Sequence, residues 1–413
     1  MISTHAKMAW RNVWRNKRRT LLTVMAISFA CVLLVFMLSW QFGSYQTMIN
    51  LAVMIHTGHL QVQAKGYHED RNIRQVIRQP AEVLKLLAPL KQVKAVTTRA
   101  EAFSLLSSQD RTYGALVVGV DPVAEPGVSR LKKLVRRGEF LGPEDQNQAL
   151  VGRLLAKNLK LGLGGEITIL GQGKDGSIAA TVVKVKGIYY SGQDDFDRAS
   201  IQIPLSFFQN TYAMENSVHQ VVFLVKSLDQ VQTVQNALAA PLSRLKNPKP
   251  LVCLNWDQLM PGLMQSIQMD LISGSIFYAI LIIVVAFSIL NTFLMTIFER
   301  TGEFGVLLAM GATRGRLVKI LIMESGFLTF LGISVGTILG CVITLYFQEV
   351  GLEFKEAAEM LAQFGMPSKF YPRLSFLSAT LGPLAVLLVT LVTALYPAFK
   401  VRRLNIVEAL GHL

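Results

Sequence analysis

Charged residues are scarce in this chain, and cysteines are scarcer still. Only 16% of its 413 residues are charged and 51% are hydrophobic, with a mean hydropathy of +0.40. This balance is too apolar for an ordinary soluble protein and indicates a membrane protein. The three cysteines, Cys31, Cys253 and Cys341, lie far apart, and two of them fall in strongly apolar segments. No disulfide framework is therefore predicted.

Four segments with almost no charge are each long enough to cross a bilayer. Residues 21–40, 271–298 and 374–399 contain no charged side chain, and residues 320–347 contain only Glu324. Because about 20 helical residues span the roughly 30 Å hydrocarbon layer, we expect four transmembrane helices. About 230 residues of soluble composition separate the first two segments, a length typical of one or two globular domains.

The basic residues around the first segment predict the topology. Six basic residues and no acidic one precede it, whereas the 20 residues after it contain no Lys or Arg. Under the positive-inside rule this asymmetry places the N-terminus in the cytoplasm and, with four spans, the C-terminus as well. The segment lacks a small-residue cleavage site, so we expect an uncleaved anchor. The predicted location is the inner (cytoplasmic) membrane, with the large domain periplasmic or extracellular.

These patterns together predict the fold class. We expect an α-helical membrane protein with four transmembrane helices plus a large α+β extracytoplasmic domain between helices 1 and 2. The predicted segments are a cytoplasmic amphipathic helix (1–20), the first span and a stalk (21–57), the outer domain (58–255), a second stalk and span (256–298), a cytoplasmic loop (299–319), the third span (320–347), an outer loop (348–373), the fourth span (374–399) and a cytoplasmic tail (400–413).

Two β-α-β units are predicted within the outer domain. In the first, apolar and polar residues alternate from residue 60 to 65, Pro80 opens a helix over 81–90, and residues 95–106 are extended. The second consists of a strand at 218–225, a helix at 229–245 with Ser227 as a candidate cap, and a strand at 251–254. Short strands and glycine-rich turns are expected between the two units.

The third apolar segment contains a stripe of small residues and one charge. Gly332, Gly336 and Gly340 recur every four residues, a spacing that lets another helix approach closely. Packing within the subunit and packing across a dimer fit this stripe equally. Glu324 lies about one turn inside the segment, where an unpaired charge is costly. We expect it to reach the cytoplasmic interface, or to pair with Lys319 or a basic residue of the tail.

Patterns of catalysis and of nucleotide binding are missing from the sequence. Its only Gly–Lys pair, Gly173–Lys174, precedes Asp175 rather than the Ser or Thr of a phosphate-binding loop. No zinc-protease helix motif or nucleophile-elbow motif occurs either. We therefore expect a protein that is not an enzyme and holds no cofactor.

Metal and nucleic-acid binding are also not expected. The histidines at positions 56, 59 and 68 have no cluster of cysteines or carboxylates beside them, and a metal normally needs three or four converging ligands. Outside the membrane flanks, no basic run is interleaved with aromatic residues, so no nucleic acid is predicted as a partner.

Three stretches resemble one known family and bracket the membrane part. They are AWRNVWRNKRRTLLTV (9–24), ERTGEFGVLLAMGATRGRL (299–317) and YPAFKVRRLNIVEAL (396–410). Together they are similar to the FtsX-like/MacB-type ABC transporter permeases, in the branch that includes LolC and LolE. Weaker similarities to the MacB-type and lipoprotein-releasing branches occur in the outer domain.

This resemblance implies a coupling helix at 302–310 that docks into a separate ATPase subunit, which would bind ATP and Mg. The ATPase-coupling residues it implies are Arg300, Gly302, Glu303, Phe304, Gly305, Val306, Leu307, Met310 and Gly311. Phe304, Val306, Leu307 and Leu308 would be apolar anchors, Glu303 with the flanking Arg300, Arg314 and Arg316 would make polar rim contacts, and Gly311 would end the helix. The implied mechanism is mechanotransmission from the ATPase to the outer domain.

Two functions remain open at this point. The first is a permease subunit, in a homodimer or in a heterodimer with a related permease, that exports or extracts a hydrophobic or lipidated substrate such as a lipoprotein. The second is an FtsX-like signalling protein that transports nothing and activates an extracytoplasmic partner. The size of the outer domain favours the first. A periplasmic carrier or adaptor is possible, but the hairpin at 170–180 has no proline, unlike the hook loop of the lipoprotein-releasing branch.

Overall fold

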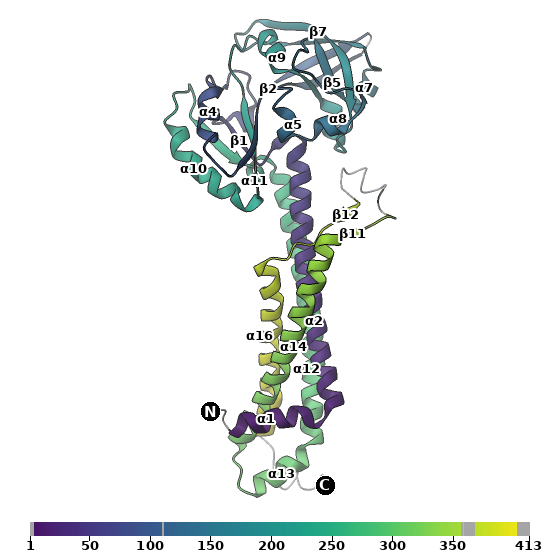
Figure 1. Cartoon of the computed structure of the whole chain (residues 1–413), viewed down its shortest axis with the longest axis vertical. Helices are drawn as coiled ribbons and strands as arrows, with labels where there is room; N and C mark the ends of the chain where they lie inside the picture. The colour runs from purple at the N-terminus through teal and green to yellow at the C-terminus, as the bar shows by residue number, and fades with distance from the viewer. Residues whose placement is uncertain (1–3, 110, 357, 359–367, 403–413) are drawn as a thin grey trace. The chain divides into compact units, whose positions relative to one another are not determined.

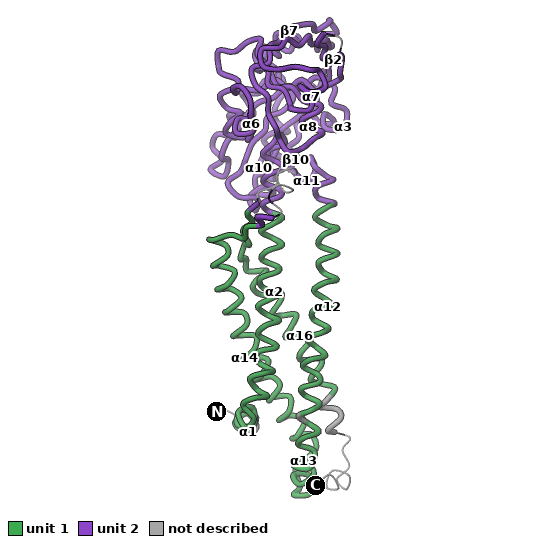
Figure 2. Tube along the Cα trace, turned by 90° about the vertical axis from the view of Figure 1, so that its right-hand side faces the viewer, with its two compact units in different colours: residues 1–45, 266–353, 369–413 green, residues 46–265, 354–368 purple. Residues whose placement is uncertain are grey.

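The computed structural model describes residues 4–109, 111–356, 358 and 368–402. The chain divides into two compact units, shown separately coloured in Figure 2. The helical unit comprises Met1–Tyr45, Ser266–Glu353 and Lys369–Leu413, and the sheet unit comprises Gln46–Gln265 and Phe354–Ser368. The apolar segments of the sequence belong to the helical unit, and the stretch of soluble composition forms the sheet unit.

Long helices dominate the helical unit (Figure 1). They are α1 (Thr4–Arg15), α2 (Lys17–Ala52), α12 (Pro261–Glu299), α13 (Thr301–Ala309), α14 (Arg314–Val350) and α16 (Phe376–Arg402), with the short strands β11 (Leu352–Glu353) and β12 (Lys369–Phe370) between the last two. In the described part of the chain, α2, α12, α14 and α16 are long and apolar enough to cross a membrane. The number of candidate membrane helices equals the predicted number of spans.

The glycine stripe of α14 packs against α2 of the same chain. A Cβ at Gly336 would lie 2.5 Å from the carbonyl oxygen of Ser28, and one at Gly332 would lie 2.7 Å from Ile27. The Ser28 hydroxyl donates to the Gly332 carbonyl at 2.9 Å. Gly340 also faces α2, with Val35 3.1 Å from the position of its missing Cβ. The stripe thus permits close contact of two helices within the subunit.

A ten-stranded mixed sheet forms most of the sheet unit (Figure 1). Its strands are β1 (Leu60–Ala64), β2 (Val93–Ser108), β3 (Arg111–Val120), β4 (Val135–Gly138), β5 (Gln148–Gly152), β6 (Glu166–Gln172), β7 (Ile178–Tyr189), β8 (Ser200–Pro204), β9 (Gln220–Val225) and β10 (Leu251–Asn255). Their order is β10-β1-β9-β2-β3-β8-β5-β7-β4, and β6 pairs with both β2 and β7. The β3–β8 and β5–β7 pairs are parallel.

Helices and helical turns accompany these strands. They are η1 (Val53–Thr57), α3 (Tyr67–Asp70), α4 (Pro80–Leu87), α5 (Glu125–Val128), α6 (Leu131–Leu134), α7 (Arg153–Asn158), α8 (Asp194–Ala199), α9 (Leu205–Thr211), η2 (Leu228–Gln230), α10 (Val231–Ser243) and α11 (Trp256–Leu259). One apolar core lies between α4, α10 and the strands β1 and β9. In another core, α7 and α9 pack against β5, β6 and β7.

The two predicted β-α-β units exist, but they are interleaved. The first is β1-α4-β2 and the second is β9-α10-β10. In the sheet, β9 lies between β1 and β2, while β1 lies between β9 and β10, which is the arrangement of split β-α-β units. Ser227 occupies the N-cap position of the helical segment that opens the second unit's helix, as predicted, but its hydroxyl donates to Asp229, at 3.0 Å, and makes no capping hydrogen bond.

Buried ionic side chains form a cluster on one face of the sheet. The guanidinium of Arg99 on β2 makes a bidentate pair with Glu125, at 2.6 and 3.0 Å, and both side chains are almost completely buried. Glu101, two residues further along β2, accepts hydrogen bonds from His56 at 2.8 Å and from Tyr67 at 3.2 Å. The cluster is therefore internally paired, as buried charges require.

This cluster also holds η1, the π-helical turn that follows α2. The carbonyl of His56 accepts from the Arg99 guanidinium, that of Thr57 from the Gln61 amide at 2.7 Å, and that of Met54 from the Arg130 backbone at 2.8 Å. Gly58 ends the turn with a φ of 70°, where a β-carbon would collide with Val222. Carbonyls at the end of a helix lack partners within it, and here the sheet unit supplies them.

Candidate functional site

Helix α13 is a nine-residue helix between α12 and α14. It ends in a Schellman motif, in which Gly311 has a φ of 93° and donates to Leu308 at 3.1 Å while Ala312 donates to Leu307 at 3.0 Å. The prediction that Gly311 ends this helix is confirmed. Thr313 precedes α14 but makes no capping hydrogen bond with its side chain.

One face of α13 packs into its own subunit. Phe304 and Leu308 are 3% and 8% exposed and join Ile297, Leu317 and Leu321 in a small apolar cluster. Gly305 is buried beside them. These side chains stabilise the loop internally, and the expectation that Phe304 and Leu308 are anchors for a partner stays a prediction.

The opposite face of α13 is open. Val306 is 41% and Met310 is 71% exposed. Glu303 is exposed on the same face, since residues three and seven positions apart share one side of a helix. Gly302 and Leu307 are half-buried at its edges. Of the residues implied by the family resemblance, Val306 and Met310 are therefore the apolar side chains most available to a partner.

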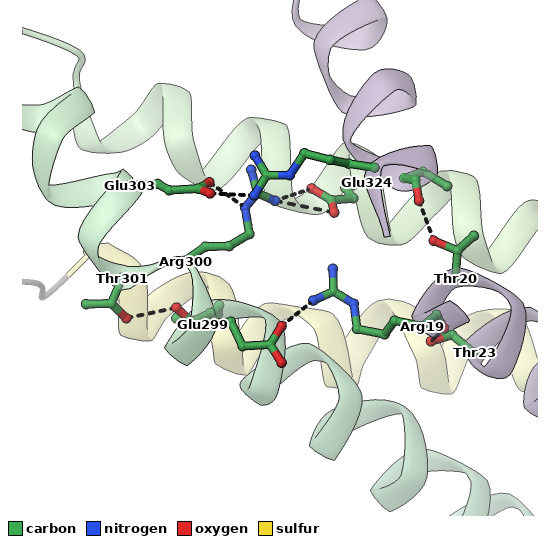
Figure 3. A network of polar contacts seen from close by, with 11 residues as sticks. Arg19, Thr20, Thr23, Glu299, Arg300, Thr301, Glu303 and Glu324 are labelled. Atoms are coloured by element: carbon green, nitrogen blue, oxygen red, sulfur yellow. Dashed lines mark hydrogen bonds and ion pairs between the residues drawn. The ribbon is translucent and has the colours of Figure 1, made fainter. Parts of the chain in front are cut away.

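A chain of ion pairs fixes α13 to its neighbours (Figure 3). Arg300, between α12 and α13, donates to Glu324 of α14 at 3.1 Å and to Glu303 at 3.2 Å. Arg15 of α1 donates to Glu303 from the other side at 2.5 Å. The hydrogen bond from Arg15, together with that from Arg300, lowers the pKa of the Glu303 carboxyl from its usual value. Glu303 is thus held ionised between two guanidinium groups.

These contacts bear on two sequence expectations. Glu324 pairs with Arg300 rather than with Lys319, while the side chains of Lys400, Arg402 and Arg403 in the tail lie outside the described residues. Arg300 is only 9% exposed and its guanidinium faces the subunit, so its contact with an ATPase stays a prediction. The isolated charge of Glu324 indicated that a partner was needed, but nothing in the sequence identified Arg300 as that partner.

Further hydrogen bonds surround this network (Figure 3). Arg19 of α2 donates to Glu299 at the end of α12, at 3.0 Å. The Thr20 hydroxyl donates to the carbonyl of Val13 and so fixes the corner between α1 and α2. The hydroxyl of Thr301 donates to Ile297 at 2.8 Å. Helices α1, α2, α12, α13 and α14 are therefore connected by polar contacts at one end of the helical unit.

The histidines considered for a metal site serve separate purposes. His56 belongs to the buried ionic cluster, whereas His59 contacts Asn50 at 3.2 Å and accepts from the Val225 backbone at 3.1 Å. Throughout the described ranges, no group of three or more His, Cys, Asp or Glu side chains could hold a metal ion. The arrangement around α13 suits the transmission of movement. A small helix with an exposed apolar face is fixed by ion pairs to the spans beside it.

Fold and site together define a multi-pass membrane protein with a sheet-rich domain inserted between its first and second spans. The family model for the MacB-like periplasmic core domain matches residues 20–240, and the model for the C-terminal part of FtsX-like permeases matches residues 275–406. The chain therefore belongs to the MacB-like family of FtsX-type membrane permeases.

Individual relatives are distant. The chain is 21% identical to the macrolide export ATP-binding/permease protein MacB of Campylobacter jejuni, an alignment that covers 98% of this chain and 61% of that protein. It is 25% identical to the lipoprotein-releasing system transmembrane protein LolE of Haemophilus influenzae, over 79% of each chain. It thus spans less than two thirds of the length of the MacB relative and most of the length of LolE.

Among solved structures, the periplasmic region of MacB from Actinobacillus actinomycetemcomitans aligns with a TM-score of 0.37 and 14% identity, covering 51% of this chain and 94% of that one.

Proposed function

We propose that this chain is the permease subunit of a MacB/LolCDE-type ABC transporter whose ATP and Mg are bound by a separate ATPase subunit. The transporter uses ATP hydrolysis to move an extracytoplasmic domain and so to export or extract a hydrophobic or lipidated substrate. The chain works as a dimer, and both of its termini lie in the cytoplasm.

The observation that carries this proposal is the construction of α13. Its inner face is buried on Phe304 and Leu308, while Val306 and Met310 are exposed beside Glu303. A short helix with a buried face and an exposed apolar face suits docking into a groove on a partner. Since α13 is also the loop between two membrane spans, a partner that moves it acts directly on those spans.

Ion pairs transmit a displacement of α13 to the neighbouring helices. Arg300 and Glu324 connect the start of α13 to α14, and Arg15 connects Glu303 to α1. From α14, close packing of the glycine stripe against Ser28 and its neighbours connects to α2. Packed cores and paired charges resist continuous deformation, so these helices move together rather than absorbing the motion.

The names of two relatives support the proposed substrate class. One relative is named for macrolide export and another for lipoprotein release. The coupling of nucleotide hydrolysis to movement of cargo is therefore the activity that the site supports best.

Substitution of the exposed face of α13 tests the proposal. Gly305→Arg is unsuitable, because Gly305 is buried and the change would disturb the packing of α13 itself. We expect Val306→Asp combined with Met310→Asp to leave membrane insertion intact and to abolish co-purification of an ABC ATPase from membranes of the native host. Ile178→Asp combined with Val182→Asp, which adds the same two charges at positions that are 79% and 46% exposed on β7, is the matched control and should retain the ATPase.

Two results would contradict the proposal. One is an equal yield of the ATPase with the α13 double variant and with the wild-type chain. The other is hydrolysis of ATP by the purified chain alone, because this would place the nucleotide site in this polypeptide.

A further inference from the structure

Helix α1 presents four distinct faces. Ala9 and Val13 are 0% and 1% exposed and form its buried seam. Trp10 and Trp14 are 41% and 47% exposed on one flank, with their rings 6.0 Å apart. The ring of Trp10 also meets the edge of Phe327, at 5.5 Å, within the apolar stretch of α14. Tryptophans in such positions are typical of the interface between membrane and water.

A basic stripe runs beside the tryptophans. Lys7 and Arg11 are four residues apart and both exposed, so they share one side of the helix. Neither has an ion pair among the described residues, and no acidic residue precedes Glu69 in the sequence. By helical geometry the stripe lies between the tryptophan flank and Arg15. Its unneutralised charge beside interfacial aromatics is complementary to a negatively charged lipid headgroup.

The remaining flank of α1 contacts α13. Arg15 lies four residues beyond Arg11 and donates to Glu303 at 2.5 Å. The corner after α1 is fixed by the hydrogen bond from Thr20 to Val13. The Arg15–Glu303 ion pair is therefore the direct connection between the lipid-facing side of α1 and α13.

We propose that α1 binds anionic phospholipid headgroups through Lys7 and Arg11 beside Trp10 and Trp14, and that this binding restrains α13 through the Arg15–Glu303 pair. A zwitterionic headgroup lacks the net charge to hold the stripe. The order of α13 thus depends on the charge of the membrane. This inference does not require an ATPase and can hold even if α13 docks a different partner.

Fluorescence quenching by brominated lipids tests the binding step. The full chain, with Trp40→Phe and Trp256→Phe so that only Trp10 and Trp14 report, is placed in nanodiscs that contain brominated phosphatidylglycerol or brominated phosphatidylcholine among unlabelled lipids. We expect a stronger quenching by phosphatidylglycerol, and we expect Lys7→Gln with Arg11→Gln to reduce this preference by roughly tenfold or more, since each basic residue near a charged surface contributes measurably.

A charge-matched control separates this stripe from total charge. Lys132→Gln with Lys133→Gln removes two exposed charges from the sheet unit and should leave the lipid preference unchanged. Equal quenching by the two lipids in the parent chain would overturn the proposal, as would equal losses of preference in the two double variants.

Hydrogen exchange tests the connection to α13. Amides of residues 301–309 should exchange several-fold more slowly in phosphatidylglycerol nanodiscs than in phosphatidylcholine nanodiscs. Arg15→Gln should remove this difference while keeping the lipid preference of the tryptophans. The proposed restraint of α13 by α1 is wrong if these amides exchange equally fast in both kinds of nanodisc. It is also wrong if Arg15→Gln leaves the difference in exchange rate unchanged.

A soluble phosphate compound tests whether the ligand is a lipid headgroup or a free phosphate. Glycerol 1-phosphate added to phosphatidylcholine nanodiscs should give no protection of residues 301–309. Protection equal to that in phosphatidylglycerol would show that the ligand is a soluble phosphate and would overturn the assignment to a lipid.

Discussion

The molecule contains two sets of ion pairs in very different surroundings. In the sheet unit, the side chains of Arg99 and Glu125 are 0% and 1% exposed. In the helical unit, those of Arg15 and Glu303 are 55% and 46% exposed, and the Arg300–Glu324 pair is intermediate, at 11% and 5%. Pairs of arginine and glutamate therefore occur both inside a core and at a surface.

This difference in burial implies a difference in role. A buried ion pair is costly to form, and removing one partner leaves a charge without solvation. An exposed pair contributes little to stability and can separate and re-form. The buried cluster therefore suits a permanent joint between η1 and the sheet, whereas the exposed pair of α1 and α13 suits a contact that changes while the protein works.

The largest expected effect comes from breaking the buried pair. Arg99→Met should lower the free energy of unfolding of the sheet unit by about 3–5 kcal/mol, because Glu125 would remain buried without its partner. Pulse proteolysis of the full chain in urea, with cleavage sites identified by mass spectrometry, measures this loss. Arg99→Met combined with Glu125→Leu should recover most of the stability. If the double variant were as unstable as the single one, the explanation through an unpaired charge would be wrong.

The next largest effect is expected from acid, which should lower the stability of the sheet unit. Burial lowers the pKa of His59 from 6.5 to about 4, so below pH 6.5 the unfolded chain binds a proton that the folded one does not. The sheet unit therefore loses stability as pH falls from about 6.5 to 4, by about 3 kcal/mol in total.

The carboxyl of Glu101 continues this trend at lower pH. Burial by itself would raise the pKa of Glu101, but the hydrogen bond from His56 and nearby positive charges outweigh it and bring the value to about 2. Its stabilising contribution is present above about pH 4.5 and lost as pH falls toward 2. Urea midpoints of the sheet unit across this pH range provide the measurement. His59→Gln should flatten the profile between pH 6.5 and 4, and an unchanged profile would exclude His59 as its source.

The intermediate pair should give an intermediate effect. Arg300→Met removes the charged hydrogen bonds to Glu324 and Glu303 and should cost about 2 kcal/mol in the helical unit. Thermal unfolding of the full chain in detergent measures it, and adding Glu324→Gln should restore part of the loss. A cost as large as that of Arg99→Met would erase the distinction between the two regions.

The smallest effect is expected for the exposed pair. Arg15→Gln should change stability by less than about 1 kcal/mol, and the change should shrink further in high salt. The same thermal unfolding assay at low and high ionic strength measures it. A large loss that is insensitive to salt would show that Arg15 is structural and would contradict its assignment to a changeable contact.

Local patterns in the sequence were enough for many single elements. Proline at position 80 and the alternation of residues 60–65 correctly predicted α4 and β1, and the glycine at 311 correctly predicted the end of α13. The four apolar segments predicted four spans. Each of these signals acts within one turn, one strand or one continuous run, so neighbouring residues alone express it.

Contacts between residues that are far apart in the sequence could not be predicted from these local patterns. The sequence showed that Glu324 needed a partner, but not that Arg300 would be that partner, because their proximity depends on how α12, α13 and α14 pack. It showed an apolar loop helix, but not which of Phe304 and Val306 faces inward. Hydrophobicity does not distinguish burial in the subunit from burial against a partner.

What the sequence alone determined is therefore the class of molecule: four apolar helices long enough for a bilayer, with one soluble domain between the first two. Tertiary structure decided the order of the strands, in which β9 and β1 interleave two β-α-β units, and the closing of the glycine stripe on α2 within one chain. The physical reason is the distance along the chain over which each interaction acts. Hydropathy, chain stiffness and turn geometry act on adjacent residues, whereas strand pairing, helix packing and ion pairing depend on which distant surfaces fit together.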